Sequence, residues 1–501
     1  MPAGGAHRPV GLLVSGGMRK LRAIALGGVL AALSATAAPA SAARLETIDA
    51  PSRYVDPATA AFANGGHVEA LRANVLLPDG YDASGRRRYP VLYLLHATGN
   101  DYRTWAEPEG GRIEDVARGL DAIVVMPEAG LGFLTNWWND GRRGDPAWER
   151  YYLEELVPLV ERRYRVRPGR RWHAIAGWSM GGLGATFLAG QRPGYFGTAV
   201  SLSGFVSIQR PYLQSLWEPA TGIDYGRLWG PSDAFYAEGH NPAALAGNLR
   251  HTRLVVTAGD GRPRPGVAFG PGGPGAAPFQ GILEEEVRFE SDDLVAAARA
   301  ADVDVAYLAH DGIHDWPYAR EDLSAAIERG LFEPVPEGPT RWAYRTVART
   351  GEAWGLAYSF ARPPEEVVTL RRAGPLLAGE GSGTVTVTTP GGCEVAAALP
   401  FERRLPRGRC TSGRLRLTVS PHRVRAGARR RLAFRATTLL RGRSVPVAGA
   451  LVTVRGRSVT TGADGRASAT VPMPARRALL RVRATKPGLR AAGAAVRVLA
   501  R

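Results

Sequence analysis

The 501-residue sequence predicts an α/β domain, in which a mostly parallel sheet lies between helices, followed by a C-terminal all-β region. Two patterns carry this prediction. Residues 43–335 alternate short apolar segments with segments whose apolar residues recur at helical spacing. Beyond residue 340 the helical spacing disappears, and short alternating segments between glycine and proline turns are typical of β-sandwiches.

The predicted strands of the α/β domain are short runs rich in valine, isoleucine and leucine. They cover residues 72–77, 90–95, 121–126, 173–176, 198–202, 254–258 and 304–308. Residues 148–164 and 282–301 have helical spacing. Residues 262–281 are dominated by glycine and proline, which predicts a mobile loop beside the site or a disordered insertion.

The all-β region is predicted to contain two modules, a small β domain at residues 340–411 and an Ig-like β-sandwich at 412–501. In the second module, the Asp-Gly pair at 464–465 lies between two alternating runs and predicts a β-hairpin. The two cysteines of the chain, Cys393 and Cys410, are predicted to form a disulfide in the first module.

The first 42 residues have the pattern of a secretory signal peptide. Basic residues at 19–22 precede an apolar run at 23–38, and Ala40-Ser41-Ala42 supplies a cleavage site. We therefore expect a mature chain that begins near Ala43 and is secreted or associated with the cell envelope. No later stretch is long and apolar enough to span a bilayer.

The formal net charge of +18 is unevenly distributed. Residues 401–501 contain 25 arginine and lysine residues against two acidic residues, whereas the first 400 residues contain 39 basic and 44 acidic residues. Such a module favours a polyanionic partner, here an anionic cell-envelope polymer, with no specific nucleic acid expected. The alternative is that arginine only fills solvated strand faces.

The sequence Gly-Trp-Ser-Met-Gly at 177–181 fits the motif G-x-S-x-G. A predicted strand precedes it and small residues follow it, which is the context of a nucleophile elbow in an α/β-hydrolase fold. The elbow predicts Ser179 as the nucleophile, with the backbone N–H of Met180 as one oxyanion donor. The two cysteines lie far from this motif along the chain, so no thiol chemistry is expected.

A serine nucleophile needs a base and an acid, which in this fold follow it in the order acid, then histidine. The base must follow the last core strand, where His314 is favoured and His310 is the alternative. By position, Asp260 is a candidate acid because it follows the strand at 254–258. No metal or organic cofactor is expected.

Four segments together resemble the putative esterase family, which includes esterase D-type hydrolases and mycolyltransferases. They are YPVLYLLHATGND (89–101), YYLEELVPLVERRYRV (151–166), IAGWSMGGLGATFLAGQRPGYFGTAVSLSGF (175–205) and GIHDWPYA (312–319). The resemblance covers most of residues 65–330. It implies His314 as the general base, Glu284 as the acid in preference to Asp260, and Thr98 as the second oxyanion donor.

Relatives place pocket residues in the segment that corresponds to residues 136–140. Trp105, Trp137, Trp138 and Trp316 are therefore predicted to form a tryptophan-rich rim for sugar rings or acyl chains, or else to cover the sheet edge. The sequence thus predicts a secreted serine esterase for small-molecule, polysaccharide or lipid esters, with acyl transfer to an envelope sugar left open. The alternative is a catalytically inactive envelope-binding protein on the same fold.

Overall fold

The computed structural model describes residues 43–58, 68, 70–82, 85–210, 218–406, 414–440, 443–486 and 489–500. The predicted signal peptide and Cys410 lie outside these residues, so both the peptide and the disulfide stay predictions. Cys393 is buried. Within the described ranges, none of the helices combines the length and the apolar character that crossing a bilayer requires.

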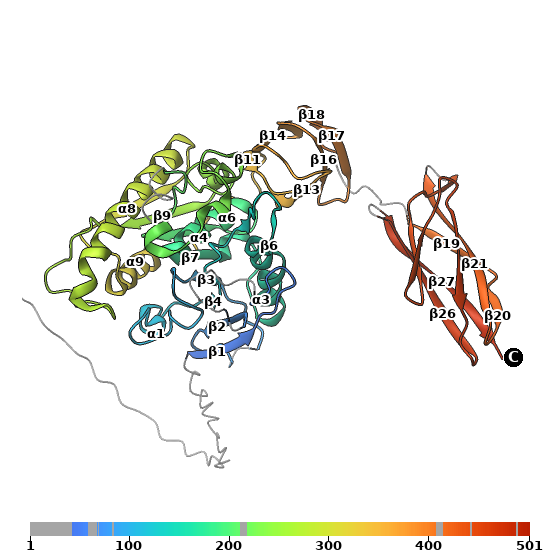
Figure 1. Cartoon of the computed structure of the whole chain (residues 1–501), viewed down its shortest axis with the longest axis horizontal. Coiled ribbons are helices and arrows are strands. Elements are labelled where there is room, and N and C mark those ends of the chain that lie inside the picture. Colours follow the sequence, from blue (N-terminus) through green and yellow to red (C-terminus); the bar gives the residue numbers. More distant parts are fainter. Residues whose placement is uncertain are drawn as a thin grey trace, which may run out of the picture. The chain divides into compact units, whose positions relative to one another are not determined.

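The α/β domain is built on an eight-stranded sheet in the order β1-β2-β4-β3-β7-β8-β9-β10 (Figure 1). The strands are β1 (Arg44–Asp49), β2 (Arg72–Leu77), β3 (Val91–Leu95), β4 (Ile123–Pro127), β7 (His173–Trp178), β8 (Thr198–Leu202), β9 (Arg253–Ala258) and β10 (Val305–Ala309). β2 is antiparallel to both of its neighbours, β1 and β4. The remaining neighbours in the sheet, in the order β4-β3-β7-β8-β9-β10, are parallel to one another. This topology is that of the α/β-hydrolase fold, so the predicted fold class is confirmed for this domain.

The seven strands predicted for this domain are all present, within two residues at either end. β1 was not predicted because only Ile48 among its residues is fully buried, which leaves little alternation to detect.

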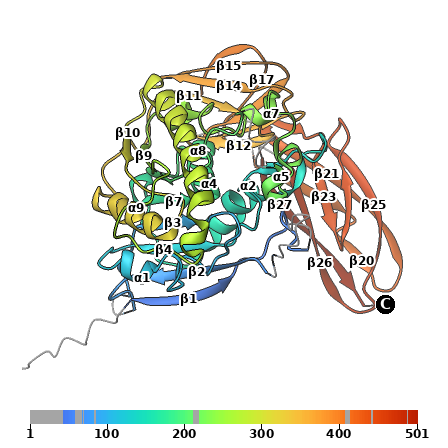
Figure 2. The same cartoon turned by 60° about the vertical axis from the view of Figure 1, so that its left-hand side comes forward.

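Helices cover both faces of the sheet, as Figures 1 and 2 show. They are α1 (Ile113–Val116), α2 (Trp148–Arg150), a π-helical turn (Tyr151–Leu156), α3 (Val157–Arg163), α4 (Met180–Gln191), α5 (Glu218–Thr221), α6 (Tyr225–Trp229), α7 (Phe235–Glu238), α8 (Gly273–Ala300) and α9 (Trp316–Glu328). One core joins alternate strand residues to α3, α4 and α8, and a second joins the intervening residues to α1 and α9. The two cores hold the ends of the parallel strands in place, and these ends carry the site.

The prediction of a loop over residues 262–281 is wrong in its second half, because α8 already begins at Gly273. Pro274 lies in the first turn, where a missing N–H removes no helical hydrogen bond. Glycine and proline usually indicate a loop, and for this reason the sequence does not reveal the first turns of α8. α9 was also missed, although Asp315 caps it by accepting from the Trp316 N–H and proline follows at 317.

Residues 341–404 form two four-stranded antiparallel sheets around a shared core. Their strands are β11 (Arg341–Thr346), β12 (Thr350–Ala353), β13 (Leu356–Phe360), β14 (Val368–Ala373), β15 (Leu376–Glu380), β16 (Thr384–Thr388), β17 (Glu394–Ala398) and β18 (Phe401–Arg404). This unit is bonded to the α/β domain: the Tyr344 hydroxyl donates to the Gln191 carbonyl, and Asn248 exchanges two hydrogen bonds with the backbone of Arg345.

Residues 414–500 form a second pair of sheets around a separate core. β19 (Arg416–Ser420), β21 (Arg429–Leu440), β22 (Arg443–Pro446) and β25 (Arg466–Pro472) make one sheet. β20 (Arg423–Arg425), β23 (Leu451–Val454), β24 (Arg457–Thr460), β26 (Ala478–Lys486) and β27 (Leu489–Leu499) make the other. The region is all-β, as predicted.

The hairpin predicted around Asp464-Gly465 is wrong. A turn does form there, closed by a hydrogen bond from the Gly465 N–H to the Gly462 carbonyl. However, β24 pairs with β23 and β25 pairs with β21, so the two flanking strands enter different sheets. The alternation on both sides of the turn reports half-buried strands and carries no information about their partners.

Candidate active site

Ser179 lies on a sharp turn between β7 and α4. Its backbone has φ 56° and ψ −116°, a conformation that residues other than glycine rarely adopt and that a nucleophile elbow requires. The flanking glycines make room for the turn. A Cβ on Gly177 would lie 2.2 Å from the Gly181 carbonyl oxygen, and a Cβ on Gly181 would lie 2.5 Å from that of Leu95. The motif glycines are therefore steric requirements of the turn.

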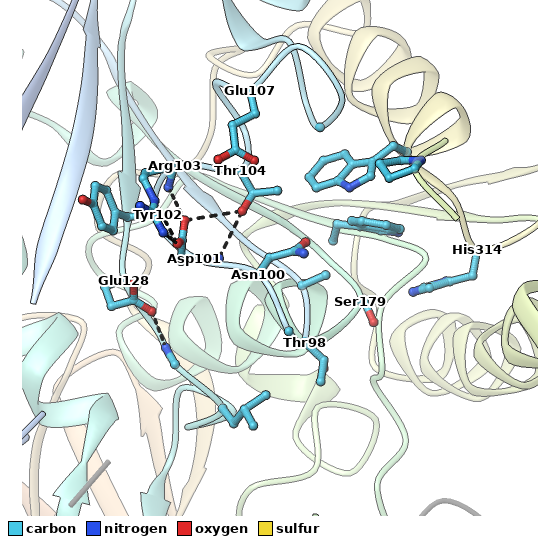
Figure 3. A pocket seen from close by; sticks show the side chains of 18 of the residues that line it. Thr98, Asn100, Asp101, Tyr102, Arg103, Thr104, Glu107, Glu128, Ser179 and His314 are labelled. Atoms are coloured by element: carbon cyan, nitrogen blue, oxygen red, sulfur yellow. Dashed lines mark hydrogen bonds and ion pairs between the residues drawn. The ribbon is translucent and has the colours of Figure 1, made fainter. Parts of the chain in front are cut away.

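His314 lies on the loop between β10 and α9, and it lines the same cavity as Ser179. Its ring stacks on Trp178, with centroids 5.0 Å apart and planes inclined by 28°. Its backbone N–H donates to the Gln280 carbonyl. Figure 3 shows the imidazole directed across the cavity toward the Ser179 hydroxyl.

Glu284, on α8, holds the other side of the His314 ring. Its Oε2 lies 2.7 Å from His314 Nδ1, and its Oε1 accepts from the Ser203 hydroxyl and the Gly259 N–H, each at 2.6 Å. Because a carboxylate only accepts, Nδ1 carries the proton and Nε2 is left as the base.

The electrostatics of Glu284 keep it ionised. Its side chain is 1% exposed, and this burial opposes its charge more strongly than any other factor. The hydrogen bond from His314, with the donors at Ser203 and Gly259, nevertheless holds the pKa of Glu284 below its ordinary value.

The two rival residues do not reach this arrangement. Asp260 accepts hydrogen bonds from the N–H groups of Arg262 and Gly312, so it braces the loop that leads to His314. His310 pairs instead with Asp322, with Nε2 2.8 Å from Oδ1. The structure therefore brings together Ser179, His314 and Glu284, and leaves Asp260 and His310 outside.

The predicted oxyanion donors adjoin the nucleophile. Met180 is the first residue of α4, directly after Ser179, and Thr98 lines the cavity on the loop after β3 (Figure 3). His96 anchors this loop: Nδ1 lies 2.9 Å from the Ala97 carbonyl oxygen, and Nε2 lies 2.9 Å from the Ala129 nitrogen.

Of the four predicted rim tryptophans, only Trp316 lines the cavity. Trp105 is fully buried behind it and donates to the Leu95 carbonyl, and Trp137 is fully buried and donates to that of Gly132. Trp138 packs against Tyr236 and lies outside the lining. The second cavity tryptophan is Trp178, inside the serine motif itself.

The cavity has a volume of about 1020 Å³, and its walls differ in polarity. One wall is polar and comes from the loop after β3; its residues are Asn100, Asp101, Tyr102, Arg103, Thr104 and Glu107 (Figure 3). Apolar side chains also line the cavity; they are Leu131, Phe133, Phe205, Tyr225 and Leu283. A cavity of this kind can hold an ester with one polar and one apolar part.

Sequence reasoning assigned no role to Ser203 or to the polar wall. Ser203 follows β8 directly, so its place at the carboxyl end of a parallel strand was a usable signal. The polar wall had no such signal, because its charged residues follow a strand but are spread along an irregular loop.

Comparison with known proteins places this site in context. Residues 69–329 match the sequence profile of a family described as putative esterase. Esterase Rv1288 of Mycobacterium tuberculosis is 33% identical over 201 residues, which are 37% of this chain and 42% of that protein. The chain thus spans less than half of the length of this relative.

Two further proteins are similar to this chain. A diacylglycerol acyltransferase/mycolyltransferase, Ag85C of Mycobacterium avium, is 27% identical over 249 residues, which are 47% of this chain and 68% of that protein. Among solved structures, a ferulic acid esterase aligns with 58% of this chain and 100% of its own, at 22% identity and a TM-score of 0.43.

Proposed function

Because the chain belongs to the putative esterase family, whose profile matches more than half of its length, we propose that it is a serine esterase that cleaves carboxylic esters through an acyl-enzyme on Ser179. The observation that carries this proposal is the 2.7 Å contact between the buried Glu284 and His314, whose ring lines the same cavity as Ser179.

The geometry supports the following sequence of steps. His314 Nε2 takes the hydroxyl proton while Ser179 Oγ bonds to the ester carbonyl carbon, and the N–H groups of Met180 and Thr98 stabilise the oxyanion. The bond to the alcohol oxygen then breaks, and His314 returns its proton to that oxygen. Water then attacks the acyl carbon while the same imidazole takes its proton. The bond from the acyl carbon to Ser179 Oγ breaks, and His314 returns the proton to Oγ, which releases the carboxylic acid and restores free Ser179.

The nucleophile assignment is tested by labelling with a fluorophosphonate probe and by turnover of p-nitrophenyl acetate and butyrate. We expect wild-type protein to be labelled and active, and Ser179→Ala to lose both properties. Ser458→Ala, an exposed serine of the C-terminal region, is the control and should remain labelled. Folded wild-type protein that neither labels nor turns over would favour the inactive, envelope-binding alternative.

A second candidate activity is acyl transfer to a sugar hydroxyl, which the polar wall favours. Asn100, Asp101 and Glu107 line the same cavity as Ser179, where their side chains can form hydrogen bonds with the hydroxyls of a sugar acceptor. We propose polysaccharide or lipid esters as the substrate class. Profiling p-nitrophenyl esters by chain length, with and without trehalose as acceptor, tests both points: acyl-trehalose formation supports transfer, and release of free acid alone supports hydrolysis.

We also propose that residues 1–42 direct export and that Cys393 and Cys410 are then bonded to each other. Recovery from the culture medium of an expressing bacterium, with an N-terminus near Ala43, is the expected result. Full-length protein retained in the cytosol would contradict it. We further propose that residues 412–501 have an Ig-like fold, and an experimental structure of this region tests that assignment.

A further inference from the structure

Both sheets of the C-terminal region carry exposed arginines on their outward faces. On the second sheet these are Arg423, Arg425, Arg481, Arg483 and Arg497, with the exposed Leu479 and Leu499 among them. On the sheet formed by β19, β21 and β25, alternate residues of β21 point into the core, where Leu432, Phe434 and Ala436 are buried. The intervening residues point outward. We call this outward surface the arginine face; it comprises Arg416, Arg429, Arg431, Arg435 and Arg466, all exposed.

These cations have little opposite charge nearby. Asp464 is the sole acidic residue of the sequence from 414 to 500, and its carboxylate lies 4.0 Å from the Arg466 guanidinium. No other ion pair occurs within the described part of this region. Arg435 and Arg466 are directly opposite each other on neighbouring strands, an arrangement of like charges that destabilises a sheet. An anion bound from outside would remove this repulsion.

Hydroxyl groups stand between the guanidinium groups. Thr418 is opposite Arg435 on one side, and Thr470 is opposite Arg431 on the other. Ser468 accepts from the Arg431 guanidinium at 3.0 Å. A guanidinium binds carboxylate or phosphate through two parallel N–H groups, and hydroxyls bind sugar hydroxyls. Along β21, the Cα atoms of Arg429 and Arg431 are roughly 7 Å apart, because a strand rises about 3.4 Å per residue.

The composition of the face selects among polyanions. Phe434 is the one phenylalanine, tyrosine or tryptophan between 414 and 500, and it is buried, so the face offers no such ring on which a nucleic-acid base could stack. A lipid surface would favour apolar side chains among the cations. The exposed Leu451, Leu479 and Leu499 instead lie on the second sheet, and on the first sheet the exposed Leu439 is near the far end of β21.

We propose that the arginine face binds a linear anionic polysaccharide, one with a carboxylate or phosphate on successive repeats. This binding does not depend on ester chemistry, so it stands or falls independently of the proposed esterase activity. It would hold the enzyme on a polymer while the catalytic cavity acts on esters.

The test compares two triple variants of the full chain that lose the same charge. Arg429→Gln, Arg431→Gln and Arg435→Gln remove the centre of the arginine face. Arg481→Gln, Arg483→Gln and Arg497→Gln remove three exposed arginines from the outward side of the second sheet. The probe is immobilised polygalacturonate, with neutral dextran as the blank, and thermal unfolding and ester turnover check that each variant is intact.

We expect the first triple variant to weaken binding to polygalacturonate at least about tenfold, and the second by less than about threefold. Equal losses in the two variants would mean that net charge alone acts, which overturns the proposal. Tighter binding of the wild type to duplex DNA or to anionic lipid vesicles than to polygalacturonate would also overturn it. If a triple variant fails to fold, the single changes Arg431→Gln and Arg483→Gln make the same comparison.

Discussion

The α/β domain and the C-terminal region place their charged groups in opposite ways. In the α/β domain, Glu284 is buried against His314, and Arg170, 3% exposed, donates to the Pro193 carbonyl and the Thr252 hydroxyl. In residues 414–500, the arginines point outward on both sheets and meet one carboxylate.

The difference separates two uses of charge. A buried ion has a few fixed partners, so its position is set to within a few tenths of an ångström, which suits a proton transfer. Exposed guanidinium groups have no fixed partner and act together through their summed field, which suits a multivalent polymer. Single substitutions should therefore be severe in the first region and mild in the second.

The largest effect should come from the buried carboxylate. Glu284→Gln is expected to lower kcat for p-nitrophenyl butyrate by about 10³- to 10⁴-fold, because an amide can donate to Nδ1 and so favour the wrong tautomer of His314. Steady-state kinetics measure this loss.

Asp260→Asn is the matched control for that variant, since it alters a nearby carboxylate that accepts hydrogen bonds from the backbone N–H groups of Arg262 and Gly312. We expect its kcat to fall less than about tenfold. A reversal of the two effects would show that Asp260 and not Glu284 is the acid.

The next largest effect concerns the packing that positions Ser179. Gly181→Ala would place a Cβ 2.5 Å from the Leu95 carbonyl oxygen and is expected to cost about 3 kcal/mol of unfolding free energy. Gly190→Ala, on the same helix, would meet no atom closer than 3.6 Å and should be neutral or stabilise by about 0.5–1 kcal/mol. Denaturant unfolding measures both, and equal stabilities would contradict the close approach.

The same contrast explains what the sequence could predict of the fold. The strands of the α/β domain are continuous apolar runs because both faces of a parallel sheet are buried, and such runs are easily recognised. Strand partners in the C-terminal region were harder, since β24 and β25 are adjacent in sequence yet enter different sheets. Alternation reveals which side of a strand is buried but does not identify its neighbour.

The catalytic residues were predictable to different degrees. Ser179 has a local motif, and His314 follows the last core strand, so local patterns identified both. Glu284 lies on a helix beside two further glutamates, and only family resemblance distinguished it from Asp260. The buried positions of Trp105 and Trp137 could not be predicted, because a tryptophan in a loop has the same local pattern whether it faces a cavity or the core.

Salt should distinguish the two regions further. Raising NaCl from about 0.05 M to about 0.5 M is expected to change turnover of a soluble ester less than twofold, because buried pairs are poorly screened. Retention on polygalacturonate should fall at least about tenfold over the same range. Deletion of residues 412–501 should leave ester turnover unchanged and abolish retention on polygalacturonate. Salt-sensitive turnover in the shortened chain would show that exposed charges of the α/β domain also contribute to catalysis.

The smallest effect is a pH dependence of stability that originates at His310. Burial works against its charge, but the Asp322 carboxylate outweighs that effect and raises the pKa of His310 to about 9. A raised pKa means that the pair stabilises the fold fully below about pH 6.5 and loses this contribution as pH rises through 9. Because His310 is partly exposed, we expect the wild-type unfolding free energy to fall by about 1–2 kcal/mol across this window beyond any fall in His310→Gln. If the unfolding free energy of the wild type and of His310→Gln changed in parallel with pH, the His310–Asp322 pair would not couple protonation to folding.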